Sequence, residues 1–195
     1  MAERATETIK FVGISGPTGA GKDYLVGNAT ERLGLNIVRM HTTRPRRPEG
    51  SENKIPVSEE VFMAYPADEL IGKHEDAGIW YTYKLEDLQN AGATIVELNP
   101  MKQAEVPDQL RAHGMEMVAW IGLHGEDEYL MHNIGNRQEM SPEELATRLR
   151  LSHEFINRLK ELSDEGIVTL YKVGWDNRST MADEFTDMID TLLNK

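Results

Sequence analysis

Glycines and a lysine are concentrated in residues 16–23, which read Gly-Pro-Thr-Gly-Ala-Gly-Lys-Asp. The spacing Gly-x4-Gly-Lys is typical of loops that bind nucleotide phosphates, because glycines let successive backbone N–H groups approach an anion. A following helix would direct its positive N-terminus at the same anion, and Lys22 would add a full charge. We therefore predict a nucleotide phosphate site formed by Gly16, Pro17, Thr18, Gly19, Ala20, Gly21, Lys22, Asp23 and Tyr24.

Asp23 departs from this pattern, because a serine or threonine usually follows the lysine and binds magnesium there. A carboxylate can hold the cation directly or through water, but without the cation it would repel a nucleotide. The alternative interpretation is a chance glycine turn before a helix. The apolar residues Phe11, Val12 and Ile14 ahead of the loop, and the helical pattern after it, favour the phosphate loop.

Arginines form the second signal, within residues 42–47, which read Thr-Thr-Arg-Pro-Arg-Arg. Guanidinium groups match phosphate oxygens with paired hydrogen bonds, so this segment is a candidate anion clamp. A solvated basic loop is the alternative. The segment follows the second predicted strand, and ligands of parallel α/β sheets bind near the carboxyl ends of the strands, which favours the clamp.

The third signal surrounds the start of a predicted helix at 141–163. Ser141 is the predicted N-cap and Glu144 completes a capping box. Arg137 lies just before this helix and Arg148 lies two turns into it. A phosphoryl-transfer site needs cations that arrive from a closing lid and neutralise the transferring group. Each arginine alone would be typical of a surface, but the phosphate loop favours a functional role for both.

The chain has 195 residues, a formal net charge of −12 and no cysteine. This charge disfavours nucleic-acid binding, and the lack of cysteine excludes disulfides, thiolate metal sites and cysteine nucleophiles. The sequence shows no apolar run that could span a membrane and no apolar signal segment, so we expect a cytoplasmic protein without a membrane partner. The six histidines have no metal-ligand spacing.

Strands and helices alternate along most of the chain. Apolar runs predict strands at 10–15, 36–40, 94–98, 116–122 and 167–173. Helical patterns lie at 22–33, 84–91, 101–113, 141–163 and 181–194. This alternation predicts an α/β fold whose parallel sheet is covered on both faces. The polar interval 41–83, with a short helix near 58–64, breaks the alternation and is about the size of a substrate-binding insertion.

Together these motifs resemble those of the guanylate kinase family of phosphate-loop kinases, over roughly residues 9–190. Residues 16–22 are similar to its nucleotide loop, residues 42–47 to its acceptor-phosphate motif, and Gly78-Ile-Trp-Tyr81 to its Gly-x-Tyr-Tyr turn. The resemblance implies ATP and Mg2+ as cofactors and a small phosphorylated molecule as acceptor. It implies catalytic roles for Lys22, Arg137 and Arg148, acceptor binding by Arg44, Arg47, Tyr81, Glu97 and Asn99, and magnesium binding by Asp23 and Glu97.

The resemblance also implies an architecture. It is a three-layer P-loop kinase fold, with a parallel sheet core, an inserted acceptor-binding subdomain and a helical lid. Residues 1–195 would form a single domain, as a monomer or homodimer. The core would comprise 9–40, 84–124 and 146–195, the insertion 41–83 and the lid 125–145.

The acceptor is where the chain departs from the family. Gly72 takes the place of the guanine-reading glutamate, Tyr83 that of a serine, and Lys54 that of a phosphate-binding tyrosine. A site built to hydrogen-bond guanine loses its discrimination when those partners are missing. The run Gly21-Lys22-Asp23 and the segment 50–53, Gly-Ser-Glu-Asn, instead resemble ribose 1,5-bisphosphate kinases, which make phosphoribosyl diphosphate.

Three functions therefore remain open from the sequence. A kinase of GMP or a related nucleoside monophosphate is the leading hypothesis, and a ribose 1,5-bisphosphate kinase is the second. The third, from another class, is a non-catalytic guanylate-kinase-like binding module. Retention of Lys22, Arg137 and Arg148 argues against the module, whereas Asp23 and the altered guanine pocket argue for it.

Overall fold

The central strand β1 (Lys10–Ser15) sends alternate side chains into two separate hydrophobic cores. Phe11 packs into one core, whereas Val12 and Ile14 pack into the other, and all three are fully buried. A period of two with both faces apolar is what a strand inside a covered parallel sheet requires. The computed structural model describes residues 8–46, 53–136 and 140–194.

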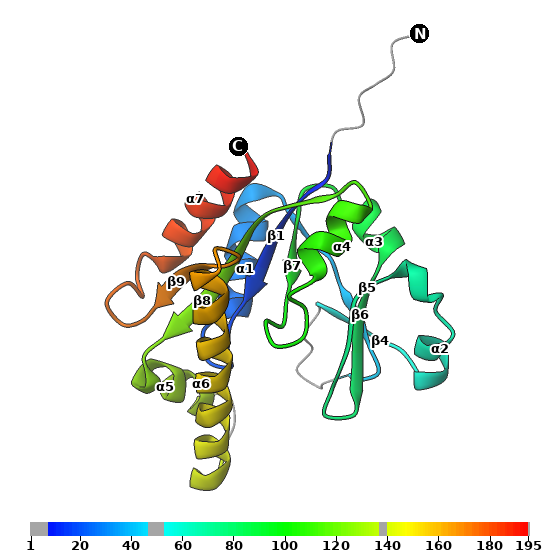
Figure 1. Ribbon diagram of the computed structural model, residues 1–195. Helices are drawn as coiled ribbons and strands as arrows, with labels where there is room; N and C mark the ends of the chain where they lie inside the picture. The colour runs from blue at the N-terminus through cyan, green and yellow to red at the C-terminus, as the bar shows by residue number, and fades with distance from the viewer. Residues whose placement is uncertain (1–7, 47–52, 137–139, 195) are drawn as a thin grey trace.

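The main sheet has the strand order β2-β7-β1-β8-β9, and each neighbouring pair is parallel. Helices α1 and α7 cover one face, and α4 and α6 cover the other, as Figure 1 shows. The predicted three-layer α/β fold is therefore confirmed. The elements named here are β2 (Asn36–Ile37), β7 (Thr94–Glu97), β8 (Glu116–Gly125), β9 (Thr169–Val173), α1 (Lys22–Leu33), α4 (Val106–Ala112), α6 (Pro142–Asp164) and α7 (Met181–Leu193).

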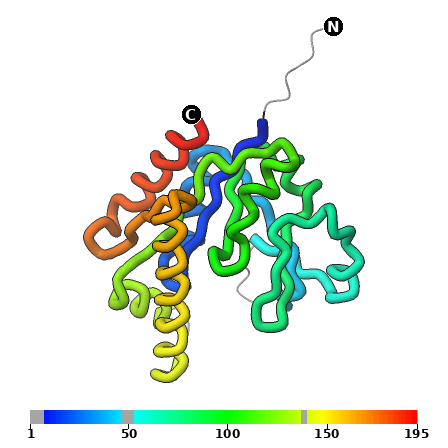
Figure 2. The backbone as a smooth tube through the Cα atoms, in the orientation of Figure 1, coloured from blue at the N-terminus to red at the C-terminus, as the bar shows by residue number. Residues whose placement is uncertain are grey.

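A second, smaller sheet lies between residues 40 and 84, with the strand order β4-β3-β6-β5. Strand β3 pairs with β4 in parallel and with β6 antiparallel. Figure 2 shows that the chain leaves the main sheet for this unit and then returns to it. Its strands are β3 (Met40–Thr42), β4 (Lys54–Pro56), β5 (Leu70–Asp76) and β6 (Ile79–Lys84), accompanied by α2 (Glu59–Met63), the 3-10 helix Ala67–Glu69 and α3 (Leu85–Gln89).

The predicted strand at 36–40 is wrong, because the chain changes sheets within it. Val38 still donates a backbone hydrogen bond to Ile95 of the main sheet, at 3.2 Å, but the Met40 amide donates to Asn53 of the second sheet, at 3.2 Å. Apolar residues continue through the crossing, so the pattern reads as one strand. The predicted helix at 101–113 is also too long, since α4 begins at Val106.

Helix α6 begins as predicted. The Ser141 side chain accepts from the Glu144 amide and the Glu144 side chain accepts from the Ser141 amide, which confirms the capping box. Ile156, Leu159 and Leu162 form the buried stripe that holds this helix on the sheet. Its N-terminal half extends beyond the sheet (Figure 1) and carries Arg148.

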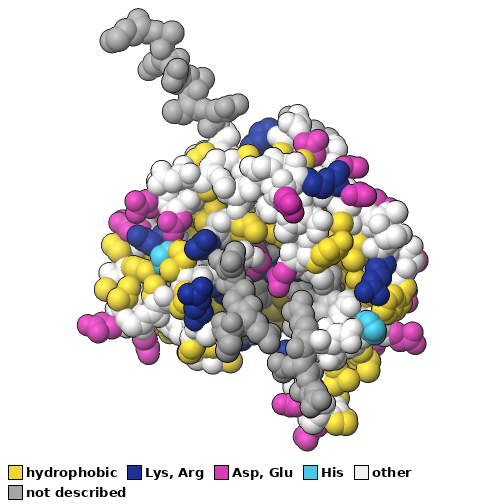
Figure 3. All heavy atoms as spheres, turned by 180° about the vertical axis from the view of Figure 1, so that it is seen from behind, with side chains coloured by type: hydrophobic (Ala, Val, Ile, Leu, Met, Phe, Trp, Pro, Cys, Tyr) yellow, Lys and Arg dark blue, Asp and Glu magenta, His cyan; other side chains and the backbone are white. Residues whose placement is uncertain are grey.

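Helix α5 (Asp127–Gly135) lies in the interval 125–145, which the resemblance implied to be a helical lid, although no helical pattern in the sequence marked it. Its side chains Tyr129 and Leu130 join the same buried core as Val12, so it is packed on the body of the protein. Within the described residues, no helix is both long and apolar enough to cross a bilayer. On the face in Figure 3, charged side chains of both signs are interspersed with hydrophobic ones.

Candidate functional site

The predicted phosphate loop joins the end of β1, at Ser15, to the start of α1, at Lys22. Gly19 and Gly21 adopt positive φ angles of 88° and 76°, which favour glycine. Gly21 is the N-cap residue of α1, and no side chain accepts a hydrogen bond at that cap. The first amides of α1 therefore point to where an anion would bind.

Neighbouring elements hold this loop in place. The Ser15 hydroxyl donates to the Leu98 carbonyl at 2.6 Å and accepts from the indole of Trp120 at 2.8 Å. The Asn133 side chain donates to the Gly19 carbonyl at 2.8 Å. Nothing in the sequence marked Asn133, because this contact depends on how α5 packs. The loop is preorganised by hydrogen bonds from three directions.

Lys22 lies between two carboxylates. Its Nζ is 2.8 Å from Oε1 of Glu97 at the end of β7, and 3.1 Å from Oδ1 of Asp23. Burial lowers the pKa of Lys22, but the two carboxylates more than offset this, so the pKa is raised above 10.5. The ammonium is therefore held charged beside the loop. Two predicted metal-binding residues and the predicted catalytic lysine thus lie together.

Lys54 reaches the same carboxylate from the second sheet. Its Nζ is 3.8 Å from Oε2 of Glu97 and 5.4 Å from the centre of the Tyr81 ring. The Asn53 side chain also donates to Glu97, at 3.3 Å. Burial, together with the charges of Lys22 and Arg44, lowers the pKa of Lys54 despite the attraction of Glu97. Lys54 is therefore a cation of this site, although the sequence analysis noted it only because it replaces a tyrosine of the family.

Tyr83, which takes the place of a serine in the family that the chain resembles, makes a hydrogen bond within the protein. Its side chain is almost fully buried, and its hydroxyl donates to the Glu97 carbonyl at 2.6 Å. Burial raises the pKa of Tyr83 well above 10.0, so the hydroxyl keeps the proton that it donates. This bond ties β6 to the end of β7 and so helps to position the Glu97 carboxylate.

Gly72, at the predicted guanine-reading position, has both backbone polar groups occupied. Its amide donates to the Gln109 side chain at 2.8 Å, and its carbonyl accepts from the Gln103 side chain at 2.9 Å. Gln103 is fully buried, and its other side-chain atom accepts from the Asn99 amide at 2.8 Å. A Cβ at Gly72 would lie only 2.5 Å from Gln103 Nε2. Gln103 and Val106 therefore fill the space that a longer residue would need.

His74 is buried next to this glutamine contact. Its Nδ1 lies 2.9 Å from the Gly72 carbonyl, and its ring stacks on Tyr81 with centroids 5.2 Å apart. Burial lowers the pKa of His74 below its ordinary 6.5, against the raising effects of the Gly72 carbonyl and Asp76. The folded protein therefore favours the neutral ring.

We expect His74 to make folding less stable under acidic conditions. The pKa of His74 is lower in the folded protein than in the unfolded chain, so the unfolded chain binds the proton more tightly. The contribution of the neutral ring to the free energy of unfolding is therefore complete above pH 6.5 and is lost as the pH falls toward the lowered pKa of the folded protein. His74→Phe keeps a ring against Tyr81 and should reduce the difference in unfolding free energy between about pH 7.5 and about pH 5, measured with urea. His124 also has a lowered pKa, so the two proteins are compared at both pH values. Equal pH dependence in both would contradict this assignment.

Two cavities open beside the loop. One, of about 620 Å³, lies between the phosphate loop, β5, the segment after β7, and α6. It is lined in part by Gly16, Pro17, Thr18, Asn99, Arg148 and Asp76. The other, of about 390 Å³, lies between the loop, α5 and the start of α7. It is lined by Gly19, Gly21, Tyr24, Tyr129, Asn133, Asn136, Arg178 and Met181.

The second cavity borders an aromatic cluster. Trp175 packs edge-on against Tyr129, with centroids 5.3 Å apart, and against His132 at 4.9 Å. The Arg178 guanidinium lies 4.8 Å from the Trp175 ring centre. Trp175 therefore packs against the protein, although 45% of it stays exposed.

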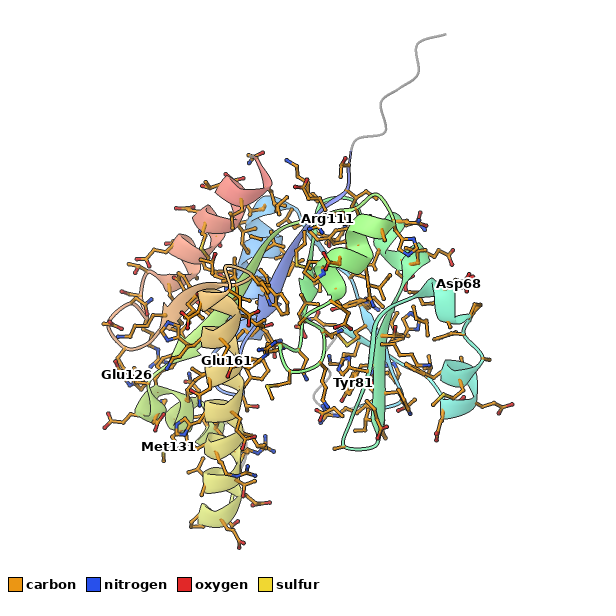
Figure 4. All side chains as sticks on the ribbon, in the orientation of Figure 1. Asp68, Tyr81, Arg111, Glu126, Met131 and Glu161 are labelled. Atoms are coloured by element: carbon orange, nitrogen blue, oxygen red, sulfur yellow. The ribbon has the colours of Figure 1, made fainter. Side chains whose placement is uncertain are left out.

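The remaining predicted site residues lie in different parts of the chain. Arg44 is half-buried just after β3, and its charge acts on Lys54. Tyr81 lies on β6 (Figure 4), with its ring centre 5.4 Å from Lys54 Nζ. In the loop, the Ala20 side chain is fully buried and its amide donates to the Pro17 carbonyl at 3.2 Å. Arg47 and Arg137 lie outside the described residues.

Comparison with known proteins supports the fold. No family model matches the chain. A guanylate kinase structure from Anaplasma phagocytophilum has 15% sequence identity and a TM-score of 0.59, covering 96% of this chain and 86% of that one. A gluconokinase structure from Sinorhizobium meliloti has 15% identity and a TM-score of 0.49, covering 96% and 98%. The match to the guanylate kinase structure shows that the chain has the P-loop kinase fold, as the resemblance implied.

A local sequence match adds a second relation. Over 60 residues the chain is 45% identical to a ribose 1,5-bisphosphate phosphokinase of Laribacter hongkongensis. The matched segment spans 29% of this chain and 14% of that protein. The relation therefore concerns a segment, and the activity of the whole relative is not transferred by it.

Proposed function

We propose that this chain is an ATP-dependent kinase that transfers a phosphoryl group to the phosphate of a small acceptor. The observation that carries the proposal is that Lys22, at the phosphate loop, and Lys54, of the second sheet, meet at the single carboxylate of Glu97, with the Tyr81 ring beside Lys54. Cations on two sides of one point suit two phosphate groups brought face to face.

The donor side fits ATP with Mg2+. The glycine conformations and the open N-terminus of α1 supply amides for the donor phosphates, with Lys22 as their counter-charge. Asp23 and Glu97 both approach Lys22 Nζ, and magnesium in such sites is held by one or two carboxylates with substrate phosphates. The ion would neutralise charge on the donor phosphates. The cavity beside Trp175 and Arg178 is our candidate for the nucleoside of the donor.

The reaction needs positioning and charge neutralisation from the protein, and no covalent intermediate. An oxygen of the acceptor phosphate forms a bond to the γ-phosphorus while the bond to the β–γ bridging oxygen breaks, and ADP leaves. Arg44 and Tyr81 would hold the acceptor phosphate. Arg148 lines the larger cavity together with Gly16 and Asn99, where it would offset charge on the transferring group.

Two acceptors are candidates. A nucleoside monophosphate such as GMP is the acceptor that the guanylate-kinase-like fold suggests. Ribose 1,5-bisphosphate is favoured by the local sequence match and by Gly72, which has no side chain and whose amide and carbonyl are engaged by Gln109 and Gln103. A base-reading group is therefore missing at that position, whereas phosphate-binding cations are present.

The test is ADP release with ATP and Mg2+ against GMP, dGMP, the other nucleoside monophosphates and ribose 1,5-bisphosphate. We expect turnover with ribose 1,5-bisphosphate to exceed turnover with GMP. Turnover with GMP alone would mean that other residues read the base. ATP binding without turnover of any acceptor would contradict the kinase and favour a non-catalytic binding module. ATP binding is measured independently of turnover, by thermal stabilisation with the nucleotide.

A further inference from the structure

The larger cavity has a cation on its wall that the proposed transfer does not use. Lys102 lies in the segment after β7 and lines this cavity, as does Arg148 of α6. In the part of the chain that the structure describes, Lys102 forms no ion pair. The pKa of His74 is lowered mainly by burial, and also by the charges of Lys54 and Lys102, so the Lys102 ammonium group lies on the side of the cavity near the second sheet.

The backbone of Lys102 is held in a short hydrogen-bonded turn. The Lys102 and Gln103 amides donate to the Asn99 carbonyl at 3.1 Å and 2.9 Å. The Asn99 side chain accepts from the Met101 amide at 3.0 Å, and the Asn99 amide donates to the buried Gln103 side chain at 2.8 Å. Asn99, which was predicted to contact the acceptor, thus uses its side-chain oxygen to shape the turn that presents Lys102 to the cavity.

Apolar side chains form the wall beside this turn. Met101 and Leu151 both line the cavity and are each 50% exposed, and Phe155 lines it one turn further along α6. Large apolar side chains left open in a concave site are typical of a surface that a ligand covers. A cation beside an apolar wall is screened less than one in open water, so it attracts an anion more strongly. The wall therefore suits an acceptor whose carbon skeleton packs on it while a charged group reaches Lys102.

We propose that Lys102 binds the second phosphate of a sugar bisphosphate acceptor, which is the phosphate that does not receive the transferred group. This assignment rests on the proposed kinase function and names a specificity residue for it. Lys102 follows Glu97, where the acceptor phosphate would react, by five residues, which span at most about 18 Å when extended, and the turn shortens this span. One small acceptor can therefore reach both places. A nucleoside monophosphate has no second phosphate for this lysine to bind.

The competing role is that of a latch, in which Lys102 pairs with Asp76 of β5 when the second sheet closes over the acceptor. Asp76 lines the same cavity, so both side chains border it. A latch would stabilise closure over any acceptor, with one phosphate or two. It would also require the Asp76 carboxylate, whereas a phosphate bound at Lys102 would be repelled by that negative charge. The two roles therefore make opposite predictions for Asp76→Asn.

The experiment measures kcat/KM with ribose 1,5-bisphosphate and with ribose 1-phosphate, which lacks only the second phosphate. We expect the wild type to prefer the bisphosphate, and Lys102→Met to reduce this preference by about 10-fold to 100-fold. The KM for ATP and the melting temperature should stay near those of the wild type. Lys102→Arg keeps the charge and should keep the preference to within about 5-fold. Asp76→Asn should keep or raise it.

The matched control is Lys160→Met. Lys160 lies further along α6, outside the lining of the cavity, and its charge acts on His124. Its loss removes one positive charge from the same helix that borders the cavity, so it reports any effect of net charge alone. We expect Lys160→Met to keep the wild-type preference between the two sugar phosphates.

Each outcome separates this proposal from the proposed function. If the wild type transfers phosphate to GMP alone, or if Lys102→Met retains the wild-type preference, the second phosphate site is overturned while the kinase stands. Equal losses with both sugar phosphates, in Lys102→Met and Asp76→Asn alike, would assign the latch and also overturn the phosphate site. For a wild type that is inactive with every acceptor, calorimetric titration of ribose 1,5-bisphosphate decides. Binding that Lys102→Met loses would support the site without the kinase, and absence of binding would end both proposals.

Discussion

Lys22→Ala is expected to lower kcat by at least about 100-fold while the protein stays folded. The lysine is the full positive charge at the phosphate loop, and both Glu97 and Asp23 hold its pKa above 10.5. Without it, the donor phosphates would keep their amide contacts and lose the charge that balances them during transfer. The measurement is steady-state ADP release with the best acceptor of the panel.

The fold should tolerate this change, because Glu97 is not left alone. Lys54 and Asn53 also contact its carboxylate, so removal of Lys22 leaves that group with partners. Lys10→Ala is the matched control. Lys10 lies at the opposite end of β1, where its Nζ donates to the Leu193 carbonyl at 3.1 Å. Turnover of Lys22→Ala close to that of Lys10→Ala would contradict the kinase.

Local signals in the sequence correctly predicted the secondary structure around residues 16–23 and at the start of α6. The phosphate loop is contained in eight residues, and its strand and helix follow from apolar patterns immediately before and after it. The α6 capping box is equally local, since Ser141 and Glu144 are three residues apart. In both places the residues that make the structure are neighbours in the chain, so their spacing carries the information.

Contacts between distant residues could not be predicted in the same way. Lys54 and Glu97 are 43 positions apart in the sequence, and Gln103 and Gly72 are 31 positions apart. A glutamine near a helix reads as a solvent-facing residue, yet Gln103 is fully buried because both of its amide atoms have backbone partners. Only the packing of β5 against the α4 region creates that environment.

The segment at 36–40 shows why pattern alone misplaces a strand. Ile37, Val38 and Met40 are all apolar, but the partner of the chain changes from β7 to β4 within these residues. Hydrophobic periodicity indicates that a side chain is buried, but it does not indicate which sheet buries it. The strand at 10–15 and the helix at 22–33 needed no such knowledge, and both were predicted at their observed bounds.

Helix α5 makes a contact between distant residues at a segment that local signals predicted, because it packs directly on the phosphate loop. Asn133 donates to the Gly19 carbonyl at 2.8 Å, and Leu130 lies against the Gly19 backbone. The beginning of the predicted lid is therefore anchored to the phosphate loop. A substitution at Gly19 should disturb the loop and α5 together.

Gly19→Ala is expected to destabilise the protein by about 3 kcal/mol. Two costs combine. The φ angle of 88° is unfavourable for alanine, and the new Cβ would lie 2.6 Å from the Leu130 carbonyl oxygen and 3.0 Å from Ile134. Because a backbone atom blocks the Cβ, the loop or α5 must shift. The stabilisation that ATP gives should therefore also fall, measured by thermal melting with and without the nucleotide.

Gly34→Ala separates the two costs. Gly34 ends α1 with a φ angle of 64°, and a Cβ there would meet nothing within 4 Å. Its substitution should therefore cost about 1 kcal/mol, from backbone conformation alone. The excess in Gly19→Ala measures the contact between the loop and α5, and urea unfolding of both variants gives it directly. Equal losses would mean that α5 moves aside without cost and that the loop is not held by it. A larger loss at Gly19, with weaker ATP stabilisation, would mean that the contact which orders the loop also prepares it to bind phosphate.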